Sequence, residues 1–277
     1  MPATDRFREE LLTTFRTFFA EAESKRRWNP YTDIPWDAVN REAPESLALC
    51  AETFMAVESF LPDYVSGAFS VIRESSLGQR WFTANWSYEE LKHSIVLHEY
   101  LVRSGKRSEE ALHDFHAQLM GRRWNVPFST GRQMTLYAIF QEHATFLIYV
   151  RQEQVALAHG DRALAACYRF NARDECAHGR FYEAAARAYL EEDREGTLRD
   201  LALVAKGFRM PGVGIVPDYD RRIVTMREDA HIDRDLFLKK VFFPTLRRLN
   251  VTRQEIAAAS AASRREAQDA GGTAATG

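Results

Sequence analysis

Residues 136–150 read LYAIFQEHATFLIYV, the most apolar stretch of the chain, with Glu142 near its middle. The stretch is too short to span a bilayer. A helix of this composition is expected in a protein core, where an ionised carboxylate is costly unless a positive group accompanies it. The stretch contains no lysine or arginine. It therefore predicts a buried helix whose carboxylate finds its counter-charge elsewhere.

Other acidic residues also lie in apolar segments. Glu58 lies in the apolar segment FMAVESFLPDYV without an obvious basic partner. The motif Glu-x-x-His occurs four times, as Glu90/His93, Glu110/His113, Glu175/His178 and Glu228/His231. The second and fourth pairs lie in polar segments and are interpreted as solvated surface pairs. The first and third lie within long helical patterns with apolar flanks, which places Glu and His on one helix face.

The spacing of these residues predicts where they meet. Glu58 and Glu90 are 32 residues apart, and Glu142 and Glu175 are 33 apart. The midpoints fall near residues 74 and 158, beside glycine-containing breaks, so each pair lies at one height of an antiparallel hairpin. A lone Glu on each of two helices facing Glu-x-x-His on the other two is the di-iron or di-manganese pattern of ferritin-like bundles.

Other interpretations of these residues remain open at this point. Glu52 could replace Glu58 as a ligand, and Glu153 could replace Glu142, although both choices break the matched spacing. A purely structural role, with ion pairs buried along a helical core, is a further alternative. Buried unpaired carboxylates are rare, which favours the metal interpretation.

Helical periodicity and breakers outline an all-α fold, a ferritin-like four-helix bundle with additional flanking helices. Pro62 is expected to kink the first long helix. We expect one domain over residues 1–250, and a short helix with a disordered tail over 251–277. The expected long helices are 47–74, 78–104, 129–158 and 161–191, and the flanking helices are 5–24, 108–120, 195–208 and 233–249.

Composition excludes several classes of function. A formal net charge of −2 without a basic stripe gives no reason to expect nucleic acid. No apolar run is long enough to span a membrane, and the N-terminus does not resemble a secretory signal. The three cysteines have no metal-ligand spacing, which suits a reducing cytoplasm.

Five segments, in chain order, resemble those of the soluble acyl-[acyl carrier protein] desaturases, the stearoyl-type di-iron enzymes. They are Trp28-Asn-Pro30 with Pro35, Glu58–Tyr64 (ESFLPDY), Trp86–His93 (WSYEELKH), Phe140–Phe146 (FQEHATF) and Asp174–His178 (DECAH). The resemblance covers about residues 25–215. At the last segment, Cys176 and Ala177 replace two basic residues of the family, which weakens the inference about carrier recognition.

The resemblance implies a set of roles. Two Fe²⁺ ions per chain would be held by Glu58, Glu90, His93, Glu142, Glu175 and His178, with O₂ as co-substrate. Asp174 would accept a hydrogen bond from a ligand histidine and connect it to Trp28, and Thr145 would lie beside the oxygen-binding face. The substrate would be a fatty acyl thioester on acyl carrier protein. A ferredoxin-like donor would supply the two electrons that each turnover needs. A homodimer is implied as well.

Some features of the substrate site are expected with less support from the sequence. Candidate linings of an acyl channel are Leu97, Met134, Phe146 and Tyr149, and candidates for a basic rim are Arg173, Arg180, Lys239 and Lys240. The alternative functions are another di-iron oxygenase, such as a hydroxylase or N-oxygenase, and a non-catalytic ferritin-like iron-binding protein.

Overall fold

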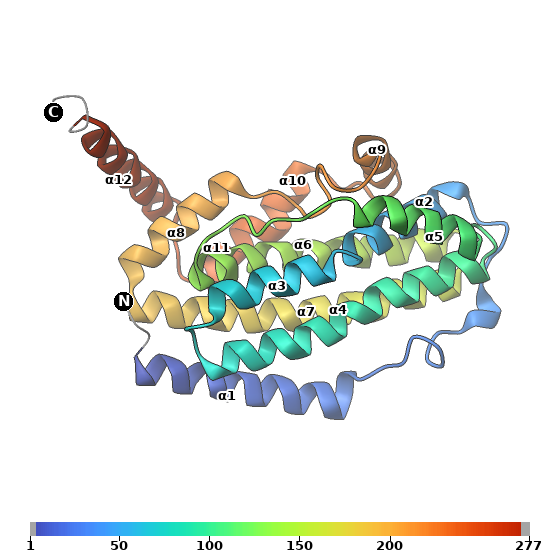
Figure 1. Cartoon of the computed structure of the whole chain (residues 1–277), viewed down its shortest axis with the longest axis horizontal. Helices are drawn as coiled ribbons and strands as arrows, with labels where there is room; N and C mark the ends of the chain where they lie inside the picture. The colour runs from blue at the N-terminus through green and yellow to red at the C-terminus, as the bar shows by residue number, and fades with distance from the viewer. Residues whose placement is uncertain (1–3, 273–277) are drawn as a thin grey trace.

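Four long helices account for the centre of the structure, a computed structural model that describes residues 4–272. They are α2 (Glu45–Glu58), α4 (Leu77–Arg103), α6 (Gly131–Ala158) and α7 (Arg162–Glu192), and they pack side by side as a bundle (Figure 1). Within residues 4–272 the structure has no β-strand. The predicted all-α bundle is therefore confirmed.

Side-chain caps fix where the long helices start. Ser76, Thr130 and Asp161 each accept a hydrogen bond from a backbone N–H three residues later, at the starts of α4, α6 and α7. Gly160 takes a φ of +71° in the turn between α6 and α7, a conformation that costs glycine little. The turn lies where the spacing of Glu142 and Glu175 predicted it.

The first predicted long helix differs from the observed one. Residues 47–74 form two helices, because α2 ends at Glu58 and α3 (Leu61–Ile72) begins with Pro62 in its first turn. Proline lacks the N–H that a continuous helix would use and is well placed in a first turn, so the chain breaks rather than kinks. Glu58 is thus the last residue of its helix.

Further helices surround the bundle (Figure 1). They are α1 (Asp5–Glu21) with a π-turn at Ala22–Arg26, a 3₁₀ turn at Trp36–Ala38, α5 (Glu109–Met120), α8 (Arg194–Gly207), α9 (Tyr219–Ala230), α10 (Arg234–Phe237), a π-turn at Leu238–Phe242, α11 (Phe243–Arg248) and α12 (Arg253–Gly272). The predicted helix 233–249 is thus split in three, and α9 was not predicted. Helix α12 extends away from the bundle and is longer than expected, while residues 273–277 lie outside the described residues.

No helix within residues 4–272 is both long and apolar enough to cross a membrane. The expected boundary between one domain over residues 1–250 and a C-terminal segment over 251–277 stays a prediction.

Helix α1 crosses α4 at Gly78. A Cβ atom at Gly78 would overlap the backbone carbonyl of Leu11. We expect Gly78→Ala to force α1 outward and lower the free energy of unfolding by about 1–3 kcal/mol, the usual cost of overpacking. Urea unfolding would measure this change. In the matched control, Gly121→Ala, the nearest atom lies 3.7 Å from the new Cβ, so stability should not fall.

A partly buried ion pair connects α11 to α7. Arg248 Nε donates to Glu183 Oε2 at 2.6 Å, and Arg187 binds the other carboxylate oxygen. Burial opposes the charge on Glu183, but hydrogen bonds from His143 and Arg248 outweigh it and lower the pKa to about 2.

This carboxylate predicts a pH dependence of stability. A lowered folded-state pKa stabilises the protein above the unfolded value of about 4.3, and this stabilisation is lost as the pH falls towards 2. Glu183→Gln should therefore be less stable than wild type at pH 7, with a difference that shrinks between about pH 4.5 and 2. Urea unfolding at several pH values measures it, and a difference independent of pH would contradict the assignment.

Candidate metal centre

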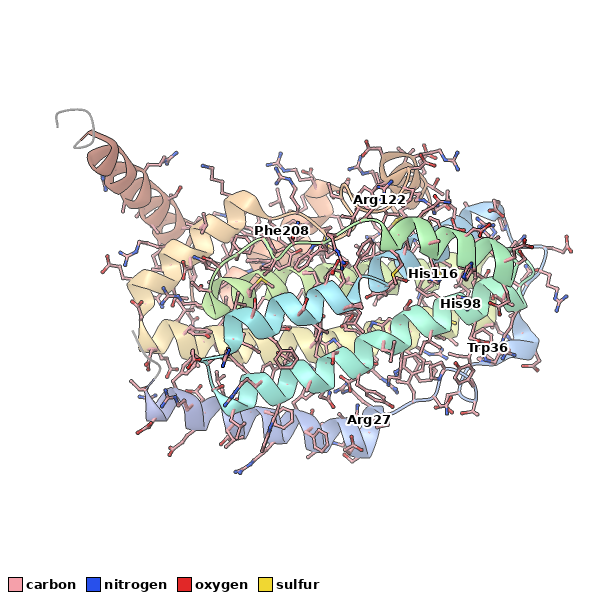
Figure 2. The ribbon with its side chains drawn as sticks, viewed as in Figure 1. Arg27, Trp36, His98, His116, Arg122 and Phe208 are labelled. Atoms are coloured by element: carbon pink, nitrogen blue, oxygen red, sulfur yellow. The ribbon has the colours of Figure 1, made fainter. Side chains whose placement is uncertain are left out.

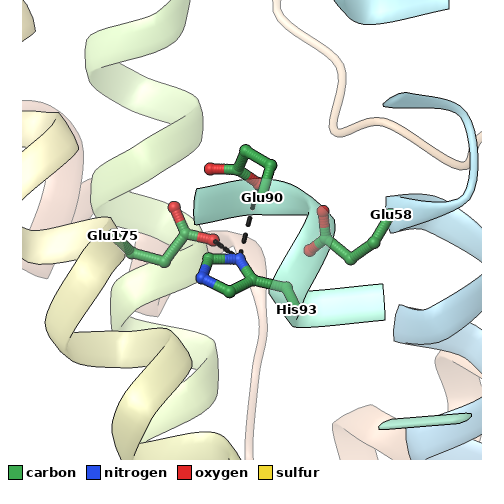
Figure 3. A group of neighbouring side chains, drawn as sticks. All are labelled: Glu58, Glu90, His93 and Glu175. Atoms are coloured by element: carbon green, nitrogen blue, oxygen red, sulfur yellow. Dashed lines mark ion pairs between the residues drawn. The ribbon is translucent and has the colours of Figure 1, made fainter. Parts of the chain in front are cut away.

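The six predicted ligand residues converge inside the bundle. Glu58 comes from the end of α2, Glu90 and His93 from α4, Glu142 from α6, and Glu175 and His178 from α7. All six are buried, with exposed fractions between 0% and 7%. Figure 3 shows Glu58, Glu90 and Glu175 gathered around the His93 ring. The structure therefore brings together every residue of the predicted set.

The six residues form two overlapping groups of four. One contains Glu58, Glu90, His93 and Glu175, and the other contains Glu90, Glu142, Glu175 and His178. In each group, one ligand atom per residue lies within 4.8 Å of the others. Glu90 and Glu175 belong to both groups, so the geometry offers two adjacent cation positions with one histidine, one terminal glutamate and two shared glutamates each.

The shared glutamates divide their oxygens between the two histidines. Glu90 Oε2 lies 3.4 Å from His93 Nδ1, and Glu90 Oε1 lies 3.0 Å from His178 Nδ1. Glu175 repeats this pattern, with Oε1 3.5 Å from His93 Nδ1 and Oε2 3.7 Å from His178 Nδ1. A carboxylate held in this way can bridge two metal ions.

Many atoms that face the centre of the cluster have no hydrogen-bond partner among the residues that the structure describes. They are Glu90 Oε1, His93 Nδ1, Glu142 Oε2, both carboxylate oxygens of Glu175 and His178 Nδ1. Buried polar atoms are normally paired, so this concentration points to ligands that the protein alone does not supply. Four carboxylates and two imidazole nitrogens suit iron or manganese, and the residues fit a pair of such ions.

Charge is poorly balanced within the cluster itself. Burial and the nearby Glu90 carboxylate raise the pKa of Glu58 to about 8. Burial and the carboxylates of Glu90 and Glu142 also raise the pKa of Glu175 well above its usual value. Burial opposes the charge on His93, but Glu90 and Asp174 outweigh it and raise the pKa to about 10. Two divalent cations would neutralise the four carboxylates without these shifts.

A further carboxylate lies beside the Nε2 atom of each histidine, on the side away from the cluster. His93 Nε2 lies 3.6 Å from Asp174, and His178 Nε2 lies 2.8 Å from Glu89. Asp174 was predicted from the sequence, whereas Glu89 was not. Such outer carboxylates set the tautomer and orientation of a ligand histidine and leave Nδ1 for a metal.

One short segment holds both outer carboxylates. Arg26 and the Trp28 indole donate to the two oxygens of Asp174 at 2.9 and 2.7 Å. Arg27 donates to Glu89 at 2.7 Å. The predicted link between Trp28 and Asp174 is therefore present as a direct hydrogen bond, and three consecutive residues position the partners of both histidines.

Two further residues bind the ligand glutamates directly. The Trp86 indole donates to Glu142 Oε1 at 3.1 Å, and the Tyr149 hydroxyl donates to Glu58 Oε1 at 2.7 Å. Tyr149 follows Glu142 by seven residues and so shares its helix face, a signal that could have identified it from the sequence. The sequence had instead suggested Tyr149 as a channel lining.

A cavity of about 520 Å³ adjoins the cluster. Glu58, Glu90, Trp86 and Thr145 line its inner part, and most of its other walls are apolar. Of the four channel residues predicted, only Met134 lines it. The opposite wall comes from segment 208–241, which contributes Phe208, Met210, Ile223, Met226, Phe237 and Val241. Phe208 and Arg27 lie on opposite sides of the bundle (Figure 2), so the cavity and the outer carboxylates are reached from different sides.

Thr145 lies at the predicted position beside the cluster. Its hydroxyl donates to the backbone carbonyl of Gln141 at 3.0 Å, as threonines within helices often do. It also lines the cavity. Its role in oxygen chemistry stays a prediction.

The rival ligands lie elsewhere. Glu52 pairs with Arg107 and Arg222, and Glu153 lies 3.9 Å from Arg169. His113 and His231 are exposed, as expected for surface pairs. The matched spacing therefore selected the residues that meet.

Comparison with known proteins agrees with this geometry. Residues 9–233 match the family described as fatty acid desaturase. The chain belongs to this family. Its relatives indicate the acyl-[acyl carrier protein] desaturase type.

The desaturase-family relatives share modest identity with the chain. Acyl-[acyl-carrier-protein] desaturase 4, chloroplastic, of Oryza sativa subsp. japonica is 33% identical over 61% of this chain and 42% of its own length. The putative acyl-[acyl-carrier-protein] desaturase DesA1 of Mycobacterium tuberculosis is 26% identical over 82% of this chain and 72% of its own length. The chain spans about half the length of the plant relatives it matches.

Solved structures support the fold of this desaturase-family chain. The putative acyl-ACP desaturase DesA2 of Mycobacterium tuberculosis has a TM-score of 0.65 at 18% identity, covering 90% of this chain and 100% of its own. An R2-like ligand-binding oxidase with a Mn/Fe cofactor has a TM-score of 0.57 at 16% identity, covering 91% and 97%. The ferritin-like fold is thereby confirmed.

The basic rim of this desaturase-family chain differs from the predicted one. Arg173, Arg180, Lys239 and Lys240 do not line the cavity, whereas Arg209, Arg227 and Arg234 do. These three arginines are exposed, and none forms an ion pair within residues 4–272. Asp220 and Asp233 also line the cavity.

Proposed function

We propose that this chain is a di-iron oxidoreductase that uses O₂ to desaturate a fatty acyl chain carried as a thioester on acyl carrier protein. The observation that carries the proposal is the pair of glutamates, Glu90 and Glu175, each of which offers one oxygen to either half of a buried site. Glu58 and Glu142 complete the two halves with His93 and His178.

The chemistry of the substrate explains the need for metal. An unactivated alkyl chain resists every side-chain acid, base or nucleophile. When bound, two iron ions would supply the oxidising power that side chains lack, with O₂ as the oxidant. Removing two hydrogens while O₂ is reduced to two waters requires two further electrons and two protons, and a ferredoxin-like protein is the proposed donor of the electrons.

The protein's own residues would position the reactants. The apolar cavity suits an acyl chain, because Phe208, Met210 and Ile223 can cover its methylene groups and exclude water. Glu58 and Glu90 at its inner part would bring the reacting carbons close to the metal site. Tyr149 and Trp86 would hold Glu58 and Glu142 in place through their hydrogen bonds.

The cavity mouth supports a carrier-borne substrate. Arg209, Arg227 and Arg234 are positive groups at its lining. Acyl carrier proteins present their thioester on a phosphate-containing arm and have acidic surfaces, which such arginines would attract. On the other side, Trp28 and Asp174 would connect His93 to the surface as a route for electrons.

Metal binding can be tested with Glu175→Gln. The variant should lose most of the increase in melting temperature that Fe²⁺ or Mn²⁺ gives to the metal-free wild type, because one shared ligand is removed. Its metal-free form should be as stable as metal-free wild type or more so, because a crowded carboxylate is neutralised. Anaerobic metal titration with thermal melts measures both quantities.

Glu183→Gln is the matched control for this experiment. It changes another buried glutamate of α7, which is paired with Arg248 instead of facing the cluster. It should lower the melting temperature and keep the increase on metal addition. If Glu175→Gln instead destabilised the metal-free protein and metal stabilised neither variant nor wild type, the cluster would be a structural ion-pair network.

Activity can be tested by product mass. Reduced iron-loaded protein should convert stearoyl- or palmitoyl-acyl carrier protein to a product lighter by two hydrogens, given ferredoxin, its reductase and O₂. Glu175→Gln should lose this activity by at least about 100-fold, the scale expected when a metal ligand is lost. A product heavier by one oxygen would identify a hydroxylase instead. Iron uptake without turnover of any carrier-bound chain would favour the non-catalytic alternative.

A further inference from the structure

Glu52, the alternative ligand that the metal cluster does not use, binds two arginines instead. It is buried in α2, and its Oε2 accepts a hydrogen bond from Arg222 Nη1 of α9 at 2.7 Å. Its Oε1 accepts another from Arg107 Nε at 2.6 Å. Arg222 is buried as well, and its guanidinium lies 5.0 Å from the centre of the Phe115 ring of α5. Separating such a pair is costly, because it leaves buried charges unpaired. We call the pair Glu52–Arg222 the α9 clasp.

Helix α9 covers the cavity with one side and faces solvent with the other. It lies on the outside of the bundle (Figure 1). Tyr219, Ile223 and Met226 follow at intervals of four and three residues, so they share one face, and all three line the cavity. Arg221 and Glu228 are exposed. The apolar face of α9 therefore packs in part against a cavity instead of a filled core, and an occupant of that cavity would add contacts to it.

The backbone leaves the helical conformation abruptly at both ends of α9. Asp218 before the helix and His231 after it have φ angles of +53° and +51°, in the left-handed region. This conformation is uncommon outside glycine. Within residues 4–272 only one other non-glycine residue, Asn250, has a positive φ. Residues at the ends of an element can absorb the change in φ and ψ that reorients it as a rigid unit.

The segment that carries α9 also forms the mouth of the cavity. Arg227 of α9 lines the cavity and is exposed, as are Arg209 before the helix and Arg234 after it. An acyl chain joined to a carrier through its thioester must enter with its methyl end first. A displacement of α9 would widen the passage for that end, and its return would shield the methylene groups from water.

We propose that α9 is a lid over the acyl cavity, which turns about Asp218 and His231 and is held closed by the α9 clasp. The proposal rests on the proposed function in one respect, because it takes an acyl chain as the occupant. Glu52 is then a positioning residue that acts through Arg222. The clasp and the occupant stabilise the same closed position, so the lid opens more often when the cavity is empty.

Hydrogen exchange of the α9 amides tests the lid in the full chain, kept anaerobic so that no turnover occurs. Arg222→Met removes the clasp from α9 and leaves Glu52 paired with Arg107, so the bundle should still fold. The α9 amides should then exchange on the order of tenfold faster or more, while those of α6 and α7 keep their wild-type rates.

A fluorescent fatty acid, cis-parinaric acid, tests the response of the lid to an occupant. Saturating wild type with this probe should slow exchange of the α9 amides, because an occupant favours the closed position. The probe should dissociate from Arg222→Met on the order of tenfold faster than from wild type. Glu52→Gln breaks the clasp from its other side and should reproduce both effects of Arg222→Met.

Arg248→Met is the matched control, because it removes an arginine from another partly buried glutamate pair and does not contact α9. It should leave α9 exchange and probe dissociation at their wild-type rates. The inference is overturned if Arg222→Met or the bound probe leaves α9 exchange unchanged, if exchange accelerates equally in α6 and α7, or if wild type does not bind the probe. Lid responses in a protein that never desaturates an acyl chain would refute the proposed function and leave the lid standing.

Discussion

The constraint on which the centre of this protein depends is the burial of four glutamates within reach of one another. Glu142 and Glu175 are fully shielded from solvent, as are His93 and His178. Within residues 4–272, Glu90 Oε1, Glu142 Oε2 and both carboxylate oxygens of Glu175 have no hydrogen-bond donor. A core with this arrangement loses stability through desolvation and repulsion unless cations enter it. The arrangement of these carboxylates therefore favours a site that holds cations.

The residues around the cluster balance the charge of the outer carboxylates but not that of the inner ones. Arg26 and Arg27 neutralise Asp174 and Glu89 behind the histidines, so the outer carboxylates are paired without metal. Of the inner carboxylates, Glu58 accepts a hydrogen bond from Tyr149 and Glu142 accepts one from Trp86. The protein thus balances the charges that orient the histidines and leaves unbalanced those that would bind cations. This division is expected of a site that must be ready for metal before metal arrives.

The positions of the ligands could be predicted because they depend on local periodicity. Equal spacing about two turns is a property of straight antiparallel helices, and it survives the break after Glu58. The cavity wall could not be predicted in this way, because segment 208–241 consists of turns and short helices whose positions depend on tertiary packing. The channel prediction was wrong for Leu97, which packs in the core, and for Tyr149, which binds Glu58. Glu89 was missed because adjacency to Glu90 does not reveal that its side chain reaches His178.

The two sides of helix α4 carry different kinds of side chain. Its inward side carries apolar core residues such as Leu97 together with the predicted ligands Glu90 and His93, so a hydrophobicity pattern alone does not separate its two sides. Its outward side carries the apolar residues at heptad spacing that a buried helix normally turns towards a core. The inward residues of α4 therefore had to be recognised from the spacing of Glu90 and His93, because the exposed Trp81, Tyr88 and Leu91 weaken any amphipathic pattern.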